Sequence, residues 1–262
     1  MISLTGEANM NTKPVIVLCT FGTSTEAMAT YDYINEIISK NYPEYEIQWA
    51  YTSSIVIKKL KEDGIVNHTL SEVYENLRKE GKTNVIVQSL HIVPGQEFHQ
   101  KIVMVPAKGL NVKYGYPLLS DDSDFEKLSK ALESHFAPEN ESVTILCGHG
   151  NDHHPEFNAS LIRMDEYLRK NRKNTFLATV EGQPGIEKAF NDVRDAGLGK
   201  VHFVPIMLVA GDHIINDVMG DEEDSWKNQL APMEATTEKG MGYNGAVLRI
   251  FMDHINKALE QF

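Results

Sequence analysis

An internal repeat is the feature that most constrains the fold. Residues 70–97 align without a gap on residues 186–213, at a constant offset of 116 residues. Five identical pairs fall in this match: Arg78 and Arg194, Gly81 and Gly197, Val85 and Val201, Val93 and Val209, Gly95 and Gly211. A second match pairs residues 17–22 with residues 145–150. Because helix, turn and strand patterns repeat together, the chain is predicted to contain two copies of one unit.

Each copy is predicted to alternate strands with helices. Residues 14–19 form a continuous apolar run, which is typical of a parallel strand buried on both faces. Thr23 and Glu26 have the spacing of a helix capping box, and Thr69 and Glu72 repeat that spacing before a second helical pattern. The alternation favours the α/β class with open parallel sheets.

The boundary between the two copies is expected in a connecting helix. Ser123 and Glu126 predict the start of this helix, and Pro138 predicts a break after it. A last helical pattern closes the chain, and the sequence leaves open which half it packs on. The predicted organisation is an N-terminal α/β half at 13–121, a connecting helix and linker at 122–142, a C-terminal α/β half at 143–245 and a terminal helix at 246–262.

Composition restricts the partners of the chain. The formal net charge is −12, from 37 acidic and 25 basic residues, and no Lys/Arg-rich tract is present. Nucleic-acid binders need the opposite charge pattern, so no nucleic-acid partner is expected. No apolar run approaches the roughly 18 residues of a membrane helix, so no membrane partner is expected either. Assembly into a homo-oligomer is a fair expectation for a soluble enzyme.

The first residues and the cysteines favour a cytoplasmic location. Residues 1–12 lack the basic start and apolar stretch of a secretory signal, and either Met1 or Met10 fits as the translation start. Cys19 and Cys147 both lie in apolar strand-like runs. This placement predicts reduced, buried thiols rather than a disulfide.

Three candidate metal ligands lie at predicted strand ends. In open parallel sheets, ligands bind beyond the carboxyl ends of the strands. His149 follows one such strand, and it corresponds to Phe21 in the first copy of the repeat. His213 follows another strand and corresponds to Glu97 in the first copy. Two imidazoles and a carboxylate suit Co²⁺, Ni²⁺, Fe²⁺ or Zn²⁺ and leave open positions for an incoming ligand.

The remaining histidines near these positions have a weaker claim to bind metal. His149 and His153 have the i, i+4 spacing of helical metal ligands, but His149 is expected at a strand end, where that geometry is not available. His153 and His154 are therefore expected to be solvated or to support the ligands. His91 and His99 flank Glu97; each is a candidate to face substrate or to support the ligands, and a purely structural role is the alternative. No glycine-rich nucleotide motif follows the first strand, so no nucleotide cofactor is expected.

Several stretches together resemble one family. They are 20–24, 51–53, 87–92 with Gly95 and Glu97, 148–150 with His153 and His154, 205–213, 216–217 and 224–227. On these stretches the chain is similar to the ATP-independent sirohydrochlorin cobaltochelatases of the anaerobic cobalamin pathway, which are related to the ferrochelatases. The resemblance covers nearly the whole length after residue 13. It implies two Rossmann-like parallel-sheet domains, related by a pseudo-two-fold axis, with the cleft between them.

The resemblance implies a reaction and a set of site residues. The reaction is insertion of Co²⁺, as the substrate metal, into sirohydrochlorin. His149 and His213 would be the essential metal-binding histidines, with His149 also the proton acceptor and Glu97 the third ligand. The expected substrate-binding residues are Phe21, Gly22, Thr23, Ser24, Thr52, Ser53, His91 and Gly150. His153, His154 and Asp212 are expected to contact the ligand side chains rather than the metal itself.

The sequence leaves alternatives open. Nothing in it decides between cobalt, iron and nickel, or fixes the tetrapyrrole. The chain therefore also fits an iron or nickel chelatase acting on sirohydrochlorin or a porphyrin. A non-catalytic tetrapyrrole or metal carrier with the same fold is an alternative of another class.

Overall fold

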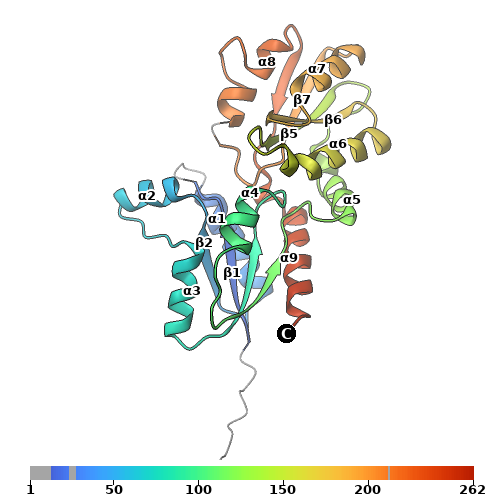
Figure 1. Cartoon of the computed structure of the whole chain (residues 1–262). Helices are drawn as coiled ribbons and strands as arrows, with labels where there is room; N and C mark the ends of the chain where they lie inside the picture. Colours follow the sequence, from blue (N-terminus) through green and yellow to red (C-terminus); the bar gives the residue numbers. More distant parts are fainter. Residues whose placement is uncertain (1–12, 24–27, 212) are drawn as a thin grey trace, which may run out of the picture.

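The computed structural model describes residues 13–23, 28–211 and 213–262, and it forms two α/β halves (Figure 1). Within these described residues, no helix is long and apolar enough to cross a membrane. The first half contains β1 (Val15–Thr20), α1 (Met28–Asn41), β2 (Ile47–Tyr51), α2 (Ser54–Glu62), α3 (Leu70–Lys79), β3 (Asn84–Ser89), α4 (Gln96–Phe98), the π-helix η1 (His99–Val103) and β4 (Asn111–Gly115).

The rest of the chain builds the connector, the second half and a final helix. The connector holds α5 (Asp122–Ala131) and η2 (Glu133–His135). The second half contains β5 (Val143–Gly150), η3 (Pro155–Asn158), α6 (Ala159–Asn171), β6 (Thr175–Glu181), α7 (Ile186–Asp195), β7 (Lys200–Pro205), the π-helix η4 (His213–Val218), α8 (Trp226–Gln229) and β8 (Glu234–Thr237). The short η5 (Met241–Tyr243) leads into the final helix α9 (Gly245–Leu259).

The two halves have the same sheet topology. The strand orders are β2-β1-β3-β4 and β6-β5-β7-β8, and every pairing is parallel. The predicted α/β class with two parallel sheets is therefore confirmed. In both sheets the first strand of the half lies in the interior beside the third strand, so the loops after these strands emerge side by side at the carboxyl edge.

The repeat seen in the sequence is present in three dimensions. Helices α3 and α7 begin and end at matching positions of the repeat, and so do strands β3 and β7. Gly81 and Gly197 both have positive φ angles, of 73° and 66°. Gly22 and Gly150, the pair from the second match, have positive φ angles of 99° and 81°. Only glycine adopts this conformation without strain, so the matched glycines mark the same turns in both halves.

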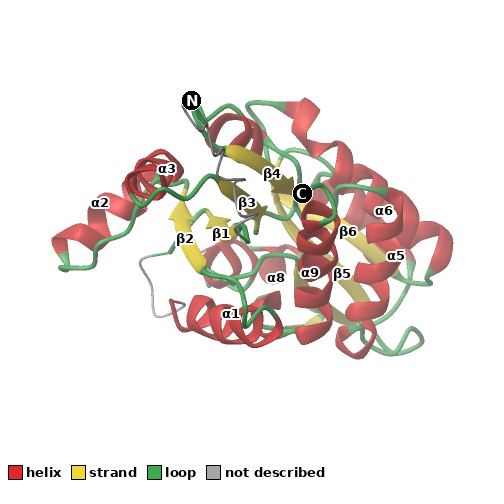
Figure 2. Cartoon of the chain, turned by 90° about the horizontal axis from the view of Figure 1, so that it is seen from below, coloured by secondary structure: helices red, strands yellow, loops and turns green. Residues whose placement is uncertain are grey.

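Helices cover both faces of each sheet. One face of the first sheet packs on α3, and the other packs on α1 and α9 (Figure 2). The cluster that contains α1 and α9 continues through α5 and α6 onto β5, so one hydrophobic core runs through both halves. Helix α9 lies against β3 and β4, which places the terminal helix on the first half (Figure 1).

Helix caps and the two cysteines were predicted from local sequence patterns. The Thr69–Glu72 capping box is confirmed at the start of α3. The predicted cap of the connecting helix by Ser123 and Glu126 is wrong, because the capping box of α5 is formed by Asp121 and Asp124. The Asp124 carboxylate makes three contacts in this position: it accepts from the backbone amides of Ser120 and Asp121, and it pairs with His254. The Thr23–Glu26 box lies partly outside the described residues. Cys19 and Cys147 are separate buried thiols, as expected.

Gly150 allows a strand end to approach its neighbour closely. A Cβ added there would lie 1.6 Å from the carbonyl oxygen of Glu181 at the end of β6. Gly64 also has a positive φ, of 81°, but nothing lies within 4 Å of its added Cβ. The Gly64→Ala variant should therefore lose only about 1 kcal/mol of unfolding free energy, and Gly150→Ala at least about 3 kcal/mol, because the backbone must also move apart. Urea unfolding measures both, and equal losses would contradict this interpretation.

Candidate functional site

Two histidines from different loops of the second half lie face to edge. His149 is at the end of β5, and His213 begins η4 after the loop that follows β7. Their ring centroids are 4.6 Å apart, and the ring planes are at 89° to each other. Imidazole nitrogens bind first-row ions at about 2.0–2.1 Å, so rings this close can each direct one nitrogen at a shared ion.

Hydrogen bonds indicate which nitrogen of each ring carries the hydrogen. Nδ1 of His149 is 2.9 Å from the carbonyl oxygen of Gly150. Nδ1 of His213 is 2.7 Å from Oδ2 of Asp217. A carbonyl and a carboxylate oxygen only accept, so both Nδ1 atoms carry the hydrogen that is donated. Each neutral ring therefore has its lone pair on Nε2, which is the atom required of a metal ligand or a proton acceptor.

Glu97 lies in α4, at the position of the first half that corresponds to His213. Its Oε2 atom is buried and has no hydrogen-bond partner among the described residues. Burial, and then the charge of Glu97, raise the pKa of the neighbouring Cys19 thiol well above its usual range. A buried carboxylate oxygen without a donor is costly unless a cation or proton reaches it. Within the described part of the chain, however, no three His, Cys, Asp or Glu side chains are grouped closely enough to hold a metal ion.

The loops that carry Glu97 and His149 touch across the two halves. The Nδ2 atom of Asn151 donates to Oε1 of Gln96 over 3.4 Å. The ring of His99 stacks on that of Phe157, with centroids 5.7 Å apart. The residues beside Glu97 and the residues after His149 are therefore in direct contact. The carboxylate and the imidazole pair are on facing loops, although the three side chains do not form one cluster in this structure.

Comparison with known proteins identifies the family. The family described as cobalt chelatase (CbiK) matches residues 14–260 of the chain. The chain belongs to the CbiK family. Two curated CbiK relatives span almost the same length. A sirohydrochlorin cobaltochelatase of Salmonella typhimurium is 31% identical over 258 residues, which cover 94% of this chain and 97% of the relative. The sirohydrochlorin cobaltochelatase CbiKC of Nitratidesulfovibrio vulgaris is 26% identical over 264 residues, covering 95% and 91%.

Solved structures show the same fold as this CbiK member. SirB from Bacillus subtilis with Fe³⁺ superposes with a TM-score of 0.66 at 14% identity, covering 94% of this chain and 96% of that one. The sirohydrochlorin chelatase SirB from Bacillus subtilis subspecies spizizenii in complex with cobalt gives a TM-score of 0.62 at 12% identity, covering 95% and 96%. The predicted chelatase-like fold is therefore confirmed.

Of the expected substrate-binding residues, the described ones in the first half lie at the carboxyl edge of its sheet. Phe21 directly follows β1, and 49% of its surface is exposed. Gly22 and Thr23 continue that loop, and Ser24 lies outside the described residues. Thr52 and Ser53 are buried instead of free for a ligand. The backbone amides of Thr52 and Ser53 donate to the carbonyl oxygens of Thr20 and Phe21, and the Ser53 hydroxyl caps α2 by accepting from Val56.

His91 is held among hydroxyl groups at the end of the third strand. Its Nδ1 is 3.0 Å from Oγ of Ser89, and its Nε2 is 3.5 Å from Oγ1 of Thr52. Burial lowers the pKa of His91 to about 4. The ring is therefore neutral at physiological pH, so it can form hydrogen bonds but no ion pair.

The described interactions of His154 are made with residues other than the proposed ligands. His153 is exposed, and the Nδ1 of His154 lies 3.5 Å from Glu156. The backbone amide of His154 donates to Oδ1 of Asn151, which stabilises the loop after His149. Asp212 lies outside the described residues. Gly150 has no room for a side chain, because an added Cβ would collide with the carbonyl oxygen of Glu181. The close approach of the two strand ends therefore explains this glycine without a ligand.

Asp217 is the functional candidate that sequence reasoning missed. It lies four residues after His213 on η4 and accepts from Nδ1 of that ring. The spacing of His213 and Asp217 was visible in the sequence, but it points to a contact only once the segment is known to be helical. π-helices occur often at functional sites, and this CbiK member has one after the third strand of each half.

Removing the Asp217 carboxylate should weaken the role of His213. In Asp217→Ala the ring loses the partner that fixes its tautomer and orientation, and outer partners of this kind are typically worth about 10- to 100-fold in metal affinity or activity. We expect a loss of this size in kcat/KM for the metal, smaller in Asp217→Asn because the amide oxygen still accepts. Glu222→Ala, which removes an exposed carboxylate nearby, is the control. Equal activity in Asp217→Ala and the control would contradict this role.

Proposed function

We propose that this protein inserts Co²⁺ into sirohydrochlorin without ATP, at a site formed by His149, His213 and Glu97. The observation that carries the proposal is the imidazole pair, with both Nδ1 atoms hydrogen-bonded and the ring centroids 4.6 Å apart. Membership of the CbiK family, and two relatives named as sirohydrochlorin cobaltochelatases, support the metal and the substrate.

The arrangement suits delivery of a metal that must afterwards be released. Two neutral imidazoles bind a divalent ion without neutralising its charge and leave further positions open. The nitrogens of the macrocycle can then replace them in steps. The buried Oε2 of Glu97 lies on the facing loop without a donor. We propose that Glu97 approaches the ion from the first half when the tetrapyrrole occupies the space between the halves.

Two pyrrole protons must leave as the metal enters. Once the nitrogens of the macrocycle have displaced Nε2 of His149 from the ion, that atom accepts one of these protons, and the ring becomes an imidazolium as the N–H bond of the macrocycle breaks. His149 suits this role because it is exposed and its Nδ1 is bound only to a carbonyl oxygen, so water can take the proton away. His213, bound to the Asp217 carboxylate, is the more firmly held ligand. The second proton passes to Glu97 or to water.

A metal comparison tests the proposal. Sirohydrochlorin in excess over enzyme is mixed with Co²⁺, Fe²⁺ or Ni²⁺ under anaerobic conditions, and insertion is followed by absorbance, with protoporphyrin as a second acceptor. We expect many turnovers per enzyme and the highest kcat/KM for Co²⁺ with sirohydrochlorin. Metal affinity alone is not a substitute, because the Irving–Williams order favours copper whatever the function.

Two outcomes would replace the proposal. Faster insertion of Fe²⁺ or Ni²⁺ would make the chain an iron or nickel chelatase. Product formation limited to one equivalent per protein would make it a carrier. The cytoplasmic location, the lack of a nucleotide cofactor and assembly into a homo-oligomer stay predictions.

A further inference from the structure

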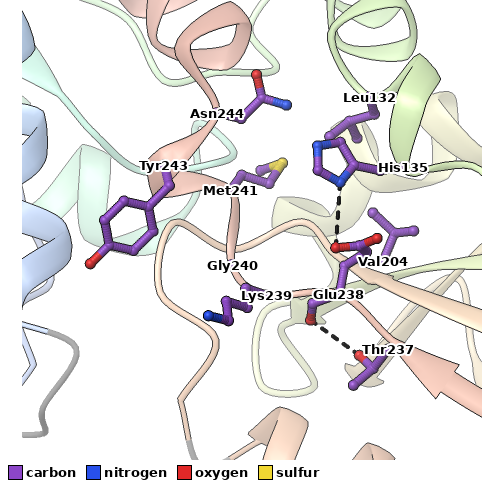
Figure 3. A pocket seen from close by; sticks show the side chains of 10 residues that line it. All are labelled: Leu132, His135, Val204, Thr237, Glu238, Lys239, Gly240, Met241, Tyr243 and Asn244. Carbon is purple, nitrogen blue, oxygen red and sulfur yellow. Dashed lines mark hydrogen bonds and ion pairs between the residues drawn. The ribbon is translucent and has the colours of Figure 1, made fainter.

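A cavity of about 600 Å³ lies at the carboxyl ends of β7 and β8, beside the segment that crosses from the second half to α9 (Figure 3). Its apolar lining comes from Leu132, Val204 and Met241. Its polar lining comes from His135, Thr237, Glu238, Lys239, Tyr243 and Asn244. Tyr243 packs its ring on Tyr33 of α1, with centroids 5.2 Å apart. The cavity is therefore bordered by the second half and tied to a helix of the first.

The crossing segment lies directly on the loop that ends in His213. The amides of Met241 and Gly242 donate to the carbonyl oxygens of Met207 and Leu208, over 2.8 and 2.9 Å. A Cβ added to Gly240 would lie 2.5 Å from the backbone nitrogen of Ala210. The chain from Ala210 to His213 spans at most roughly 10 Å. The segment that lines the cavity is thus hydrogen-bonded to the loop that carries a proposed metal ligand.

Lys239 is the available cation in this cavity. It is exposed and makes no ion pair with any described residue. Its neighbour Glu238 is already placed between two imidazoles, 3.5 Å from Nδ1 of His135 and 3.7 Å from Nε2 of His202. Figure 3 shows the Lys239 side chain extending away from the pair of His135 and Glu238. The ammonium group is therefore free to meet an anion from the cavity.

We propose that this cavity receives a carboxylate-bearing arm of the tetrapyrrole, with Lys239 as its counter-charge, while the ring lies over the imidazole pair. The proposal rests on the proposed function, because it names a further contact of the same substrate. A protein of net charge −12 repels a polycarboxylate at long range, so attraction must be local. Apolar walls beside one ammonium suit the methylene and carboxylate parts of such an arm.

Charge removal at Lys239 tests the contact. Lys239→Gln removes the charge and shortens the side chain by one atom but keeps it polar, and Lys239→Arg keeps the charge. We measure the Kd of metal-free sirohydrochlorin by fluorescence and the KM and kcat of cobalt insertion, at low and high salt. Lys239→Gln should raise Kd and KM about fivefold at low salt, with kcat within about twofold, and the difference should shrink at high salt. Lys239→Arg should stay near the wild type.

Lys200→Gln is the matched control, because Lys200 begins β7 at the opposite edge of the same sheet and should leave all constants unchanged. An unchanged Kd in Lys239→Gln, an equal rise in Lys239→Arg, or an equal rise in Lys200→Gln would each overturn the proposal. The binding measurement uses no cobalt. It therefore decides the Lys239 contact even if the wild-type chain inserts no metal, which would instead remove the proposed function.

Discussion

His149→Ala and His213→Ala should each lower the rate of cobalt insertion by about 10²- to 10⁴-fold while the protein stays folded. Each change removes one free Nε2 atom from a pair of rings whose centroids are 4.6 Å apart. A single remaining imidazole binds the ion more weakly and cannot hold it in a fixed position. His149→Ala also removes the proposed proton acceptor, so its loss should appear mainly in kcat.

The experiment compares both variants with His68→Ala, which removes an imidazole just before the Thr69 cap of α3. Initial rates are followed by absorbance over a range of Co²⁺ concentrations, and circular dichroism checks the fold. His68→Ala should insert cobalt at the wild-type rate. Near-native rates in both site variants would show that the imidazole pair does not deliver the metal.

Glu97→Gln should lower activity without lowering stability. The buried Oε2 atom has no hydrogen-bond partner in the described structure, and a buried charged oxygen without a donor costs free energy. The amide has the same size and no charge, so the unfolding free energy should stay equal or rise by about 1 kcal/mol. If Glu97 is the third ligand, kcat/KM for Co²⁺ should fall about 100-fold.

Glu75→Gln on the exposed side of α3 is the matched control and should alter neither quantity. Unfolding by urea gives the stability, and initial rates give the activity. A Glu97→Gln protein that is less stable than the wild type, with unchanged kcat/KM, would make Glu97 a structural residue. That result would leave the histidines as the whole metal-binding set.

The repeat made most of the fold predictable. Matched glycines such as Gly81 and Gly197 mark turns that the backbone requires, and apolar runs between them can only be buried strands. The start of α5 was not predicted correctly, because Asp121 and Ser123 both satisfy a capping pattern and only tertiary contacts of Asp124, such as its pair with His254, select one. The packing of α9 on the first half likewise depends on contacts between distant segments.

The candidate site was predictable in part. Strand-end position brought His149 and His213 together in the prediction, and the structure places their rings in contact. The sequence could not reveal that Thr52 and Ser53 would be buried, since hydroxyl groups at strand ends serve loops as readily as ligands. It also gave no sign of the cavity beside Lys239, whose walls come from the connector, two strands and the start of α9.

One cobalt ion should be held jointly by His149 and His213. Anomalous diffraction at the cobalt edge, from crystals grown with Co²⁺, locates the ion directly. We expect a single strong peak about 2.1 Å from Nε2 of both rings, the distance typical of imidazole bound to a first-row ion such as zinc. A peak bound by other side chains, with neither Nε2 within coordination distance, would show that these two histidines do not hold the metal.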